Sequence, residues 1–382
     1  MSKYRKTRKI WKRRLKKKFP SYFLFGLTCV VTLVLLFFIL YMHHDKKIKG
    51  AEAIPVTPYV SAFEGELYVN GFHFRSVGVN RYNLATNNLP YMGCGSAFTN
   101  EQLDQLFQEL NHMGVTSLRF WLFQSFTKSG TDYTRLDYII SLADKYNIKL
   151  IPVFENQWAD CSQGGYKQNE WYKSGYKSPY GSYPISLKTY IKKVVSRYKN
   201  TTAIMMWQIM NESESWNTDA LYNFVKDISS DIKTLDKNHM VSFGTMGGNQ
   251  PGTSIYRKIH SLPSIDILEV HDYSGAEVTD PFPYRFTDAQ VLNKPIMTGE
   301  AGINLDSGMT EQERADAFSK KMNVFFQSGG DVYLIWSYHD TNSQTSGGWD
   351  FAYNDPLVSV IQQIAAPFAL PATPALTITP GK

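Results

Sequence analysis

The sequence is poor in the residues and motifs that mark several large classes of protein. Its 382 residues include only 3 cysteines, 26 glycines and 17 prolines, which excludes a disulfide-rich scaffold and a collagen-like repeat. It has no HExxH segment and no Ser-His-Asp order, and among its 8 histidines only the adjacent His43 and His44 come close to a metal-ligand spacing. We therefore expect no metal, no cofactor and no serine nucleophile.

Charged residues are also scarce, at 19% of the chain against 43% hydrophobic residues, which provides a core and excludes disorder for most of the chain. The net charge of +6 comes from one end, because residues 1–50 hold 14 Lys and Arg and a single acidic residue, Asp45. The other 332 residues carry 26 basic and 33 acidic side chains. Such a mildly acidic body gives no electrostatic basis for binding phosphates, so we expect no nucleic-acid partner.

The first 50 residues have the pattern of a membrane anchor. Residues 1–20 form a basic segment with 11 Lys and Arg, and residues 21–42 follow without a charge. As a helix these 22 residues would span about 33 Å, against roughly 30 Å for the hydrocarbon core of a bilayer. The cations favour a cytoplasmic N-terminus and an extracellular remainder. The alternative is a long signal peptide cleaved before secretion, although the apolar part of a signal usually has only about 7–15 residues.

Beyond the anchor, composition divides the chain into a stem, one folded domain and a tail. Residues 43–58 are polar and contain proline, and residues 367–382 contain four prolines among small residues. Residues 59–366 show no second break in composition, and we expect one domain that acts as a monomer. Cys94 and Cys161 fall in this domain, where they either form a disulfide or remain two thiols.

The pattern of this domain predicts an α/β fold, a (β/α)8 TIM barrel with an N-terminal hairpin. Asn70-Gly71 favours a type I′ turn between two alternating runs. Thr99 and Ser186 are placed as N-caps of two later helices. Eight apolar, strand-like runs alternate with helical periods or long loops, at residues 76–80, 116–121, 149–154, 203–210, 240–245, 265–270, 295–298 and 332–336. A doubly wound sheet is the rival, but no glycine-rich phosphate loop follows the first strand.

Polar and aromatic residues end the predicted strands, and in such a barrel the carboxyl ends of the strands form the active-site face. These residues are Asn80, Arg119, Glu155, Asn156, Asn211, Glu212, His271, Tyr273, Glu300 and Trp336. Hydrolysis of a glycosidic bond requires two facing carboxyl groups, one protonated and one ionised. A single glutamate at a strand end is more often a salt-bridge or capping residue, whereas several at one face of one barrel favour catalysis.

Two of these segments resemble glycoside hydrolases of clan A, and most of all family 5, the cellulase and mannanase family. They are Trp207-Gln-Ile-Met-Asn-Glu212 after the fourth strand and Thr298-Gly-Glu-Ala-Gly302 after the seventh. The resemblance implies that Glu212 is the acid/base, that Glu300 is the nucleophile, and that the configuration of the sugar is retained. It further implies substrate-binding or supporting roles for Asn211, Arg119, His271, Tyr273 and Trp336.

These implied roles agree with the chemistry of the side chains. Arg119 should hold Glu300 in its ionised form, and Glu212 needs a raised pKa to donate a proton. Asn211 can donate a hydrogen bond to the sugar 2-hydroxyl, and Trp336 offers a flat apolar face to the sugar ring.

The loop after the third strand bears on the identity of the sugar. Residues 155–185 contain seven aromatic residues, which suit stacking on sugar faces but also pack on one another. The segment that holds Asn156 and Trp158 is similar to one in family 5 β-mannanases, although Cys161 replaces a bulky residue there. We expect a retaining β-glycoside hydrolase of a β-linked polysaccharide, with mannan or glucomannan favoured. The alternatives are a β-1,4-glucanase or transglycosylase of the same family, or a non-catalytic surface carbohydrate-binding barrel.

Overall fold

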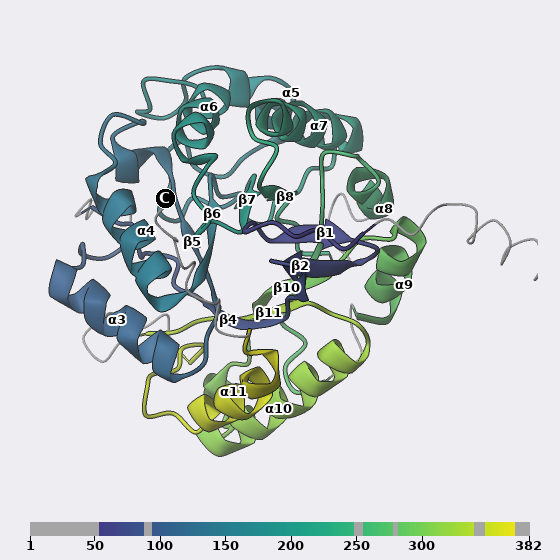
Figure 1. Ribbon diagram of the computed structural model, residues 1–382. Helices are drawn as coiled ribbons and strands as arrows, with labels where there is room; N and C mark the ends of the chain where they lie inside the picture. The colour runs from purple at the N-terminus through teal and green to yellow at the C-terminus, as the bar shows by residue number, and fades with distance from the viewer. Residues whose placement is uncertain (1–52, 88–93, 248–254, 278–281, 340–347, 371–382) are drawn as a thin grey trace, which may run out of the picture. The chain divides into compact units, whose positions relative to one another are not determined.

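The computed structural model describes residues 53–87, 94–247, 255–277, 282–339 and 348–370 (Figure 1). The chain separates into two compact units, Met1–Ile54 and Pro55–Lys382, and all elements named below belong to the second. The expected anchor at 21–42 lies outside the described residues, as do the basic segment at 1–20 and most of the tail. Within the described ranges, no helix combines the length and the apolar character that crossing a bilayer requires.

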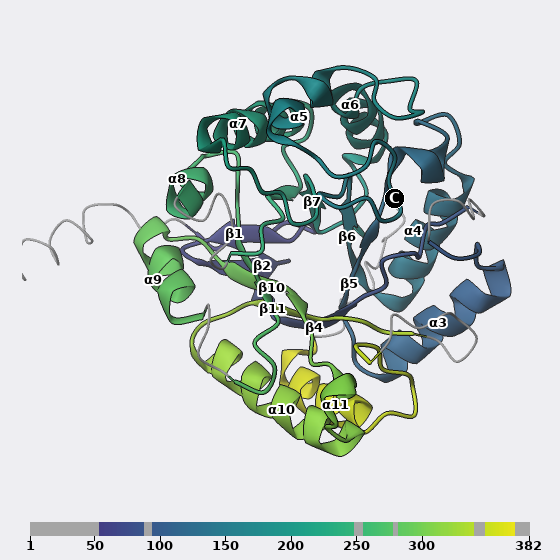
Figure 2. The same ribbon diagram turned by 180° about the vertical axis from the view of Figure 1, so that it is seen from behind.

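A small antiparallel sheet opens the second unit. It comprises β1 (Ser61–Phe63), β2 (Glu66–Val69) and β3 (Phe72–His73). Asn70 and Gly71 join β2 to β3 with φ angles of 52° and 82°, the two left-handed residues that a type I′ turn needs, so the predicted hairpin is confirmed. The side chains of Leu67 and Val69 pack in one cluster with Met205 and other buried residues of the barrel. The small sheet therefore covers barrel strands (Figure 2) and leaves their carboxyl ends to form the site.

An eight-stranded parallel sheet forms the core of this unit. Its strands are β4 (Ser76–Asn80), β5 (Ser117–Trp121), β6 (Lys149–Val153), β7 (Met206–Gln208), β8 (Met240–Ser242), β9 (Leu268–Asp272), β10 (Ile296–Ala301) and β11 (Val332–Ile335). They are paired in the order β8-β7-β6-β5-β4-β11-β10-β9. The two edges also meet, since the backbone N–H of His271 donates to Met246 O at 2.9 Å. The sheet is thus a parallel near-barrel, and all eight predicted runs overlap one of its strands.

A helix follows every barrel strand, and the helices surround the sheet (Figures 1 and 2). They are α3 (Asn100–His112), α4 (Thr134–Tyr146), α6 (Leu187–Tyr198), α7 (Thr218–Leu235), α8 (Tyr256–His260), α9 (Phe282–Leu292), α10 (Glu311–Gln327) and α11 (Leu357–Ala365). The predicted caps are present: Thr99 forms a capping box with Gln102, and the Ser186 hydroxyl accepts from the N–H of Thr189. These caps fix where α3 and α6 begin and so set the lengths of the loops before them.

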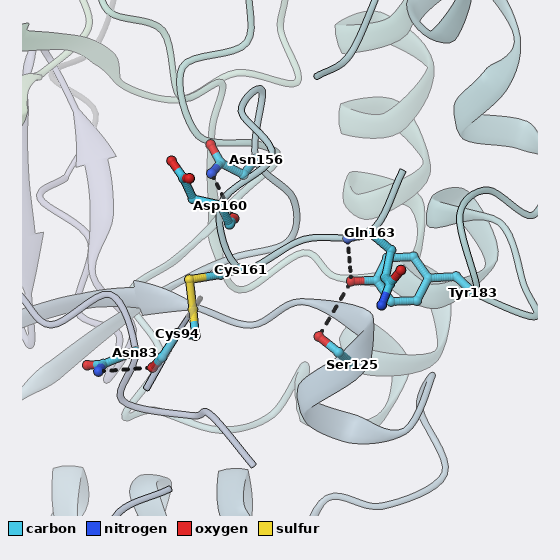
Figure 3. The surroundings of a disulfide bond; sticks show 8 residues. All are labelled: Asn83, Cys94, Ser125, Asn156, Asp160, Cys161, Gln163 and Tyr183. Carbon is cyan, nitrogen blue, oxygen red and sulfur yellow. Dashed lines mark hydrogen bonds between the residues drawn. A yellow bond between two sulfur atoms is a disulfide. The ribbon is translucent and has the colours of Figure 1, made fainter. Parts of the chain in front are cut away.

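The loop between β6 and α6 contains a short helix, α5 (Asn169–Lys173), and is tied to the loop after β4 by a disulfide. Figure 3 shows this bond between Cys94 and Cys161, whose Cα atoms lie 5.1 Å apart. Cys161 has a φ of 60°, and on the same loop the Asn156 side chain donates to the carbonyl of Asp160 at 3.2 Å. The pairing that the sequence left open is therefore a disulfide, and it holds the loop that carries Asn156 and Trp158.

Candidate active site

A cavity of about 520 Å³ opens at the carboxyl ends of the barrel strands. Seven residues that the sequence singled out line it: Asn156, Trp158, Asn211, Glu212, Tyr273, Glu300 and Trp336. Arg119 and His271, which were also expected in the site, are buried and bond to the two glutamates. A larger hollow, of about 630 Å³ between α3 and α4, contains none of the predicted residues, so the smaller cavity is the candidate site.

The two predicted catalytic carboxylates face each other in this cavity. Glu212 follows β7 with a left-handed φ of 49°, a conformation that costs energy for a side-chain-bearing residue, and Glu300 lies within β10. One oxygen of each lies within 4.8 Å of the other. Both also approach Nδ1 of His271, Glu212 at 2.9 Å and Glu300 at 3.5 Å. Retaining glycosidases hold their two carboxyl groups about 5–5.5 Å apart, and inverting enzymes about 6.5–9.5 Å apart, so this spacing fits retention.

Arg119, in the middle of β5, organises the floor of the site. Its guanidinium is fully buried and donates to Glu300 at 2.7 Å, to Asn211 Oδ1 at 2.7 Å and to Gln208 Oε1 at 2.8 Å. A fourth bond of 2.7 Å goes to Asn80, at the end of β4. One fixed cation thus connects residues from β4, β5, β7 and β10, which explains how separate strands hold their side chains in one geometry.

The two carboxylates have different partners. Glu300 accepts from Arg119 with one oxygen and from the Tyr273 hydroxyl, at 2.7 Å, with the other. Glu212 accepts from His271 Nδ1 with one oxygen and from the indole N–H of Trp158 with the other. The predicted hydrogen bond from Tyr273 to Glu300 is therefore present, and Trp158 is found to touch Glu212 directly.

Protonation in this structure differs from the expectation. Burial raises the pKa of Glu300, and the positive charges of His271 and Arg119 offset that rise only in part. Burial also raises the pKa of Glu212, but the hydrogen bond and charge of His271 outweigh it, so this pKa lies below its usual range. The prediction of a raised pKa for Glu212 is wrong here because the imidazole lies nearer to Glu212 than to Glu300.

His271 is the positive group between the carboxylates. Its burial lowers its pKa, but the charge of Glu300 and hydrogen bonds to Glu212 and Glu269 raise it to about 10. Glu269 lies 3.3 Å from the other ring nitrogen, Nε2, and also accepts from Gln208 Nε2 at 2.7 Å. Glu212, His271 and Glu300 could also offer ligand atoms to a metal ion. In its protonated form the imidazole donates from both ring nitrogens, to Glu212 and to Glu269.

Sequence reasoning missed Gln208 and Glu269. Both are fully buried, Gln208 as the last residue of β7 and Glu269 inside β9, and neither ends its predicted apolar run. The available signal was a polar residue inside an otherwise apolar strand, which in a buried position must find a partner. Here the partners are Arg119 for Gln208 and His271 for Glu269.

Aromatic rings form one wall of the cavity. Trp336 stacks on Tyr82 with centroids 5.6 Å apart, and Trp121 lies 5.9 Å from Trp336. Trp349 also lines the cavity, and its ring meets that of Tyr273 with centroids 5.2 Å apart. The wall contributed by Tyr82 and Trp121 was not predicted. Trp121 ends an apolar run, and Tyr82 follows one, between Arg81 and Asn83.

The aromatic loop after β6 divides into inner and outer residues. Tyr172, Tyr176 and Tyr183 are buried and pack in the loop, whereas Trp158 and Tyr166 are exposed. Glu155 is also buried, bonded to Ser162 and Tyr180 and 3.4 Å from Lys167 Nζ. It therefore holds the loop together and does not reach the cavity.

Comparisons with known proteins show the family of the chain. A family model described as Cellulase (glycosyl hydrolase family 5) matches residues 75–342. The chain is 30% identical over 357 residues to mannan endo-1,4-beta-mannosidase A of Aspergillus aculeatus, across 80% of this chain and 91% of that protein. It is 34% identical over 253 residues to mannan endo-1,4-beta-mannosidase F of Aspergillus clavatus, across 53% of this chain and 55% of that protein.

Solved structures share the fold. An endo-1,4-beta-mannanase from Rhizomucor miehei superposes with a TM-score of 0.67 at 20% identity, over 81% of this chain and 99% of that one. An endo-beta-1,4-mannanase from Thermotoga petrophila gives a TM-score of 0.65 at 21% identity, over 78% of each chain. With a family match over most of the barrel and a relative matched along nearly its whole length, the chain belongs to glycosyl hydrolase family 5.

Proposed function

We propose that the protein is a retaining β-mannanase in which Glu300 is the nucleophile and Glu212 the acid/base. Glu300 attacks the anomeric carbon while Glu212 protonates the leaving oxygen, and Glu212 then activates the water that releases the sugar from Glu300. The observation that carries this assignment is the approach of the two carboxylates within 4.8 Å, with Arg119 bonded to Glu300. Arg119, bonded to Glu300, is a cation that cannot give up its proton and so favours an ionised nucleophile. The cation bonded to Glu212 is His271, which can give up its proton.

The proton that Glu212 needs is available from His271. The Nδ1–H of His271 points at Glu212 at 2.9 Å, and moving that proton to Glu212 leaves a neutral ring that keeps a proton on Nε2. Glu269, 3.3 Å from Nε2, stabilises that tautomer. The low pKa of Glu212 and the high pKa of His271 then describe one shared proton.

The remaining residues would bind the sugar. The side-chain amide of Asn211 donates one N–H to Asn156 Oδ1 at 3.0 Å. Its second N–H can donate to the sugar 2-hydroxyl. Trp336, stacked on Tyr82, presents an indole to the ring of the reacting sugar. The indole N–H of Trp158 donates to Glu212, so this ring would lie beside the leaving group.

The names of the relatives and the segment around Asn156 and Trp158 favour mannan or glucomannan as the substrate. Transfer to a second sugar in place of water uses the same intermediate and is the second activity that we propose. We further propose the arrangement expected from the sequence, with a bilayer anchor at 21–42, the catalytic domain outside the cell, and a monomer.

A substrate screen tests the proposal. Reducing-end assays on mannan, glucomannan, cellulose and mixed-linkage glucan should show release from the first two, and the Glu300→Gln variant should release nothing measurable. Cleavage of the glucans alone would reject mannan as substrate, and an active Glu300→Gln variant would reject the mechanism.

A further inference from the structure

A buried ion pair joins helix α10 to the end of strand β9. Lys321 lies on α10 among the buried apolar residues Phe318, Met322 and Phe325, and its Nζ donates to Asp272 Oδ2 at 2.6 Å. The two charged side chains are 1% and 0% exposed. Burying two charges costs more than packing apolar groups of the same size, so this pair calls for a reason other than stability.

The pair fixes the backbone on both sides of Tyr273, because Asp272 precedes this tyrosine and Ser274 follows it. Asp272 Oδ1 accepts from the backbone N–H of Ser274 at 3.1 Å and lies 2.6 Å from the Ser274 hydroxyl oxygen. Lys321 Nζ also donates to that hydroxyl oxygen, at 2.9 Å. One ammonium group on α10 therefore holds both neighbours of Tyr273.

The ring of Tyr273 is held as well. A Cβ atom on Gly302 would lie 2.4 Å from Tyr273 Cε1, so the ring packs directly on the backbone of this glycine. The N–H of Gly302 donates to the carbonyl of Asp272 at 3.0 Å. The ring of Trp349 meets that of Tyr273 edge-on. Since the ring has contacts on several sides, its position follows that of the backbone at residues 272–274.

The hydroxyl of Tyr273 is the group that this arrangement places. It donates to Glu300 Oε2 at 2.7 Å. Burial raises the pKa of Glu300, and this hydrogen bond opposes the rise together with the positive charges of His271 and Arg119, whereas the negative charge of Glu212 adds to it. A hydrogen bond weakens steeply with distance and angle, so a small displacement of the ring would remove its contribution.

We propose that Lys321 is a positioning residue, which acts through Asp272 to hold the Tyr273 hydroxyl on Glu300. The inference rests on the proposed function, because it takes Glu300 as the nucleophile. Neither Lys321 nor Asp272 is among the residues that line the catalytic cavity, so the pair acts on the reaction through Tyr273 and not through the sugar. A short ionic bond fixes distance and direction more tightly than apolar packing does, which explains a charged pair in this place.

A double-mutant cycle in the full-length protein tests the coupling between Lys321 and Tyr273. Lys321→Met should lower kcat/KM on mannohexaose about tenfold or more, the effect of losing one hydrogen bond to a charged group. It should also move the acid limb of the pH profile to higher pH, because Glu300 then binds a proton more readily. In the Tyr273→Phe background the same substitution should leave the limb in place and change kcat/KM less than about twofold. Losses that multiply would overturn the inference.

Further variants separate positioning from folding. Lys321→Met leaves Asp272 as a buried charge without its ammonium partner, which lowers stability. Adding Asp272→Asn removes both charges, and this double variant should regain most of the melting temperature but keep the low kcat/KM and the shifted limb. Full recovery of activity along with stability would overturn the inference.

The matched control is Lys233→Met. Lys233, on α7, bonds at the same 2.6 Å to Asp266, which lies just before the other end of β9. This variant should lower the melting temperature and leave the pH profile unchanged. A shift equal to that of Lys321→Met would mean that breaking any such pair alters the site, and would overturn the inference.

A crystal structure of the full-length variant with Lys321→Met and Asp272→Asn tests the geometry without a substrate. The Tyr273 hydroxyl should lie more than about 3.5 Å from Glu300, beyond hydrogen-bond distance, and an unmoved hydroxyl would overturn the inference. Turnover of mannan by the unmodified protein decides the proposed function separately, because the position of the hydroxyl does not depend on turnover.

Discussion

Loss of the disulfide between Cys94 and Cys161 is expected to destabilise the barrel strongly. The bond joins positions 67 residues apart, and both half-cystines are buried. The chain-entropy relation for a closed loop of that length gives about 4 kcal/mol of stabilisation, since the bond limits the conformations of the unfolded chain. We predict that changing both cysteines to serine lowers the free energy of unfolding of the unit from Pro55 onward by about this amount.

The same change should reduce activity. Cys161 belongs to the loop that carries Asn156 and Trp158, and Trp158 bonds to Glu212 (Figure 3 shows the bridge and Asn156). A loosened loop would hold Trp158 less firmly, so we expect a higher KM and a lower kcat.

Urea denaturation followed by tryptophan fluorescence measures the stability change, with oxidised protein, reduced protein and the double serine variant compared at one pH. Reduction should shift the oxidised protein to the midpoint of the serine variant and leave that variant itself unmoved, which is the control. A loss of less than about 1 kcal/mol would refute the view that the bond constrains the unfolded chain.

Four further outcomes are expected. Glu300→Gln should lower kcat by about three or more orders of magnitude in a reducing-end assay, and a rate near that of the unmodified protein would exclude it as nucleophile. Glu212→Ala with an activated aryl substrate should be rescued by azide, which attacks the glycosyl-enzyme without a base; absence of rescue counts against the acid/base role. Removing residues 1–50 should give an active enzyme that needs no detergent, as centrifugation and assay would show. The pKa of His271 rises from 6.5 to about 10 on folding, so its contribution to the free energy of unfolding should be complete below pH 6.5 and decline as the pH approaches 10. The free energy of unfolding of His271→Gln, measured by denaturation, should therefore depend less on pH over this range.

The fold could be predicted from the sequence because the signals were local. The Asn70-Gly71 turn and the caps Thr99 and Ser186 occur where the backbone requires those residue types. Apolar runs marked all eight strands, since parallel strands covered on both faces need apolar residues throughout. The predicted run at 203–210 is longer than β7, because the apolar residues beside this short strand are buried and make only isolated pairings, such as the bridge between Ile204 and Leu150.

The positions of the site residues were predictable for a related reason. Residues that end parallel strands of one barrel must meet at one face, so Glu212 and Glu300 could be brought together without coordinates. Their protonation states could not be predicted from the sequence. They depend on the distances from His271 Nδ1, which are 2.9 Å to Glu212 and 3.5 Å to Glu300.

The account rests on two carboxylates placed for double displacement, and the stereochemistry of the first product tests that placement most directly. Proton NMR spectra collected within the first minutes of mannohexaose cleavage should show the new reducing end as the β-anomer, with the α-anomer growing in later by mutarotation. Immediate release of the α-anomer would mean that water attacks directly, and would contradict a covalent intermediate on Glu300.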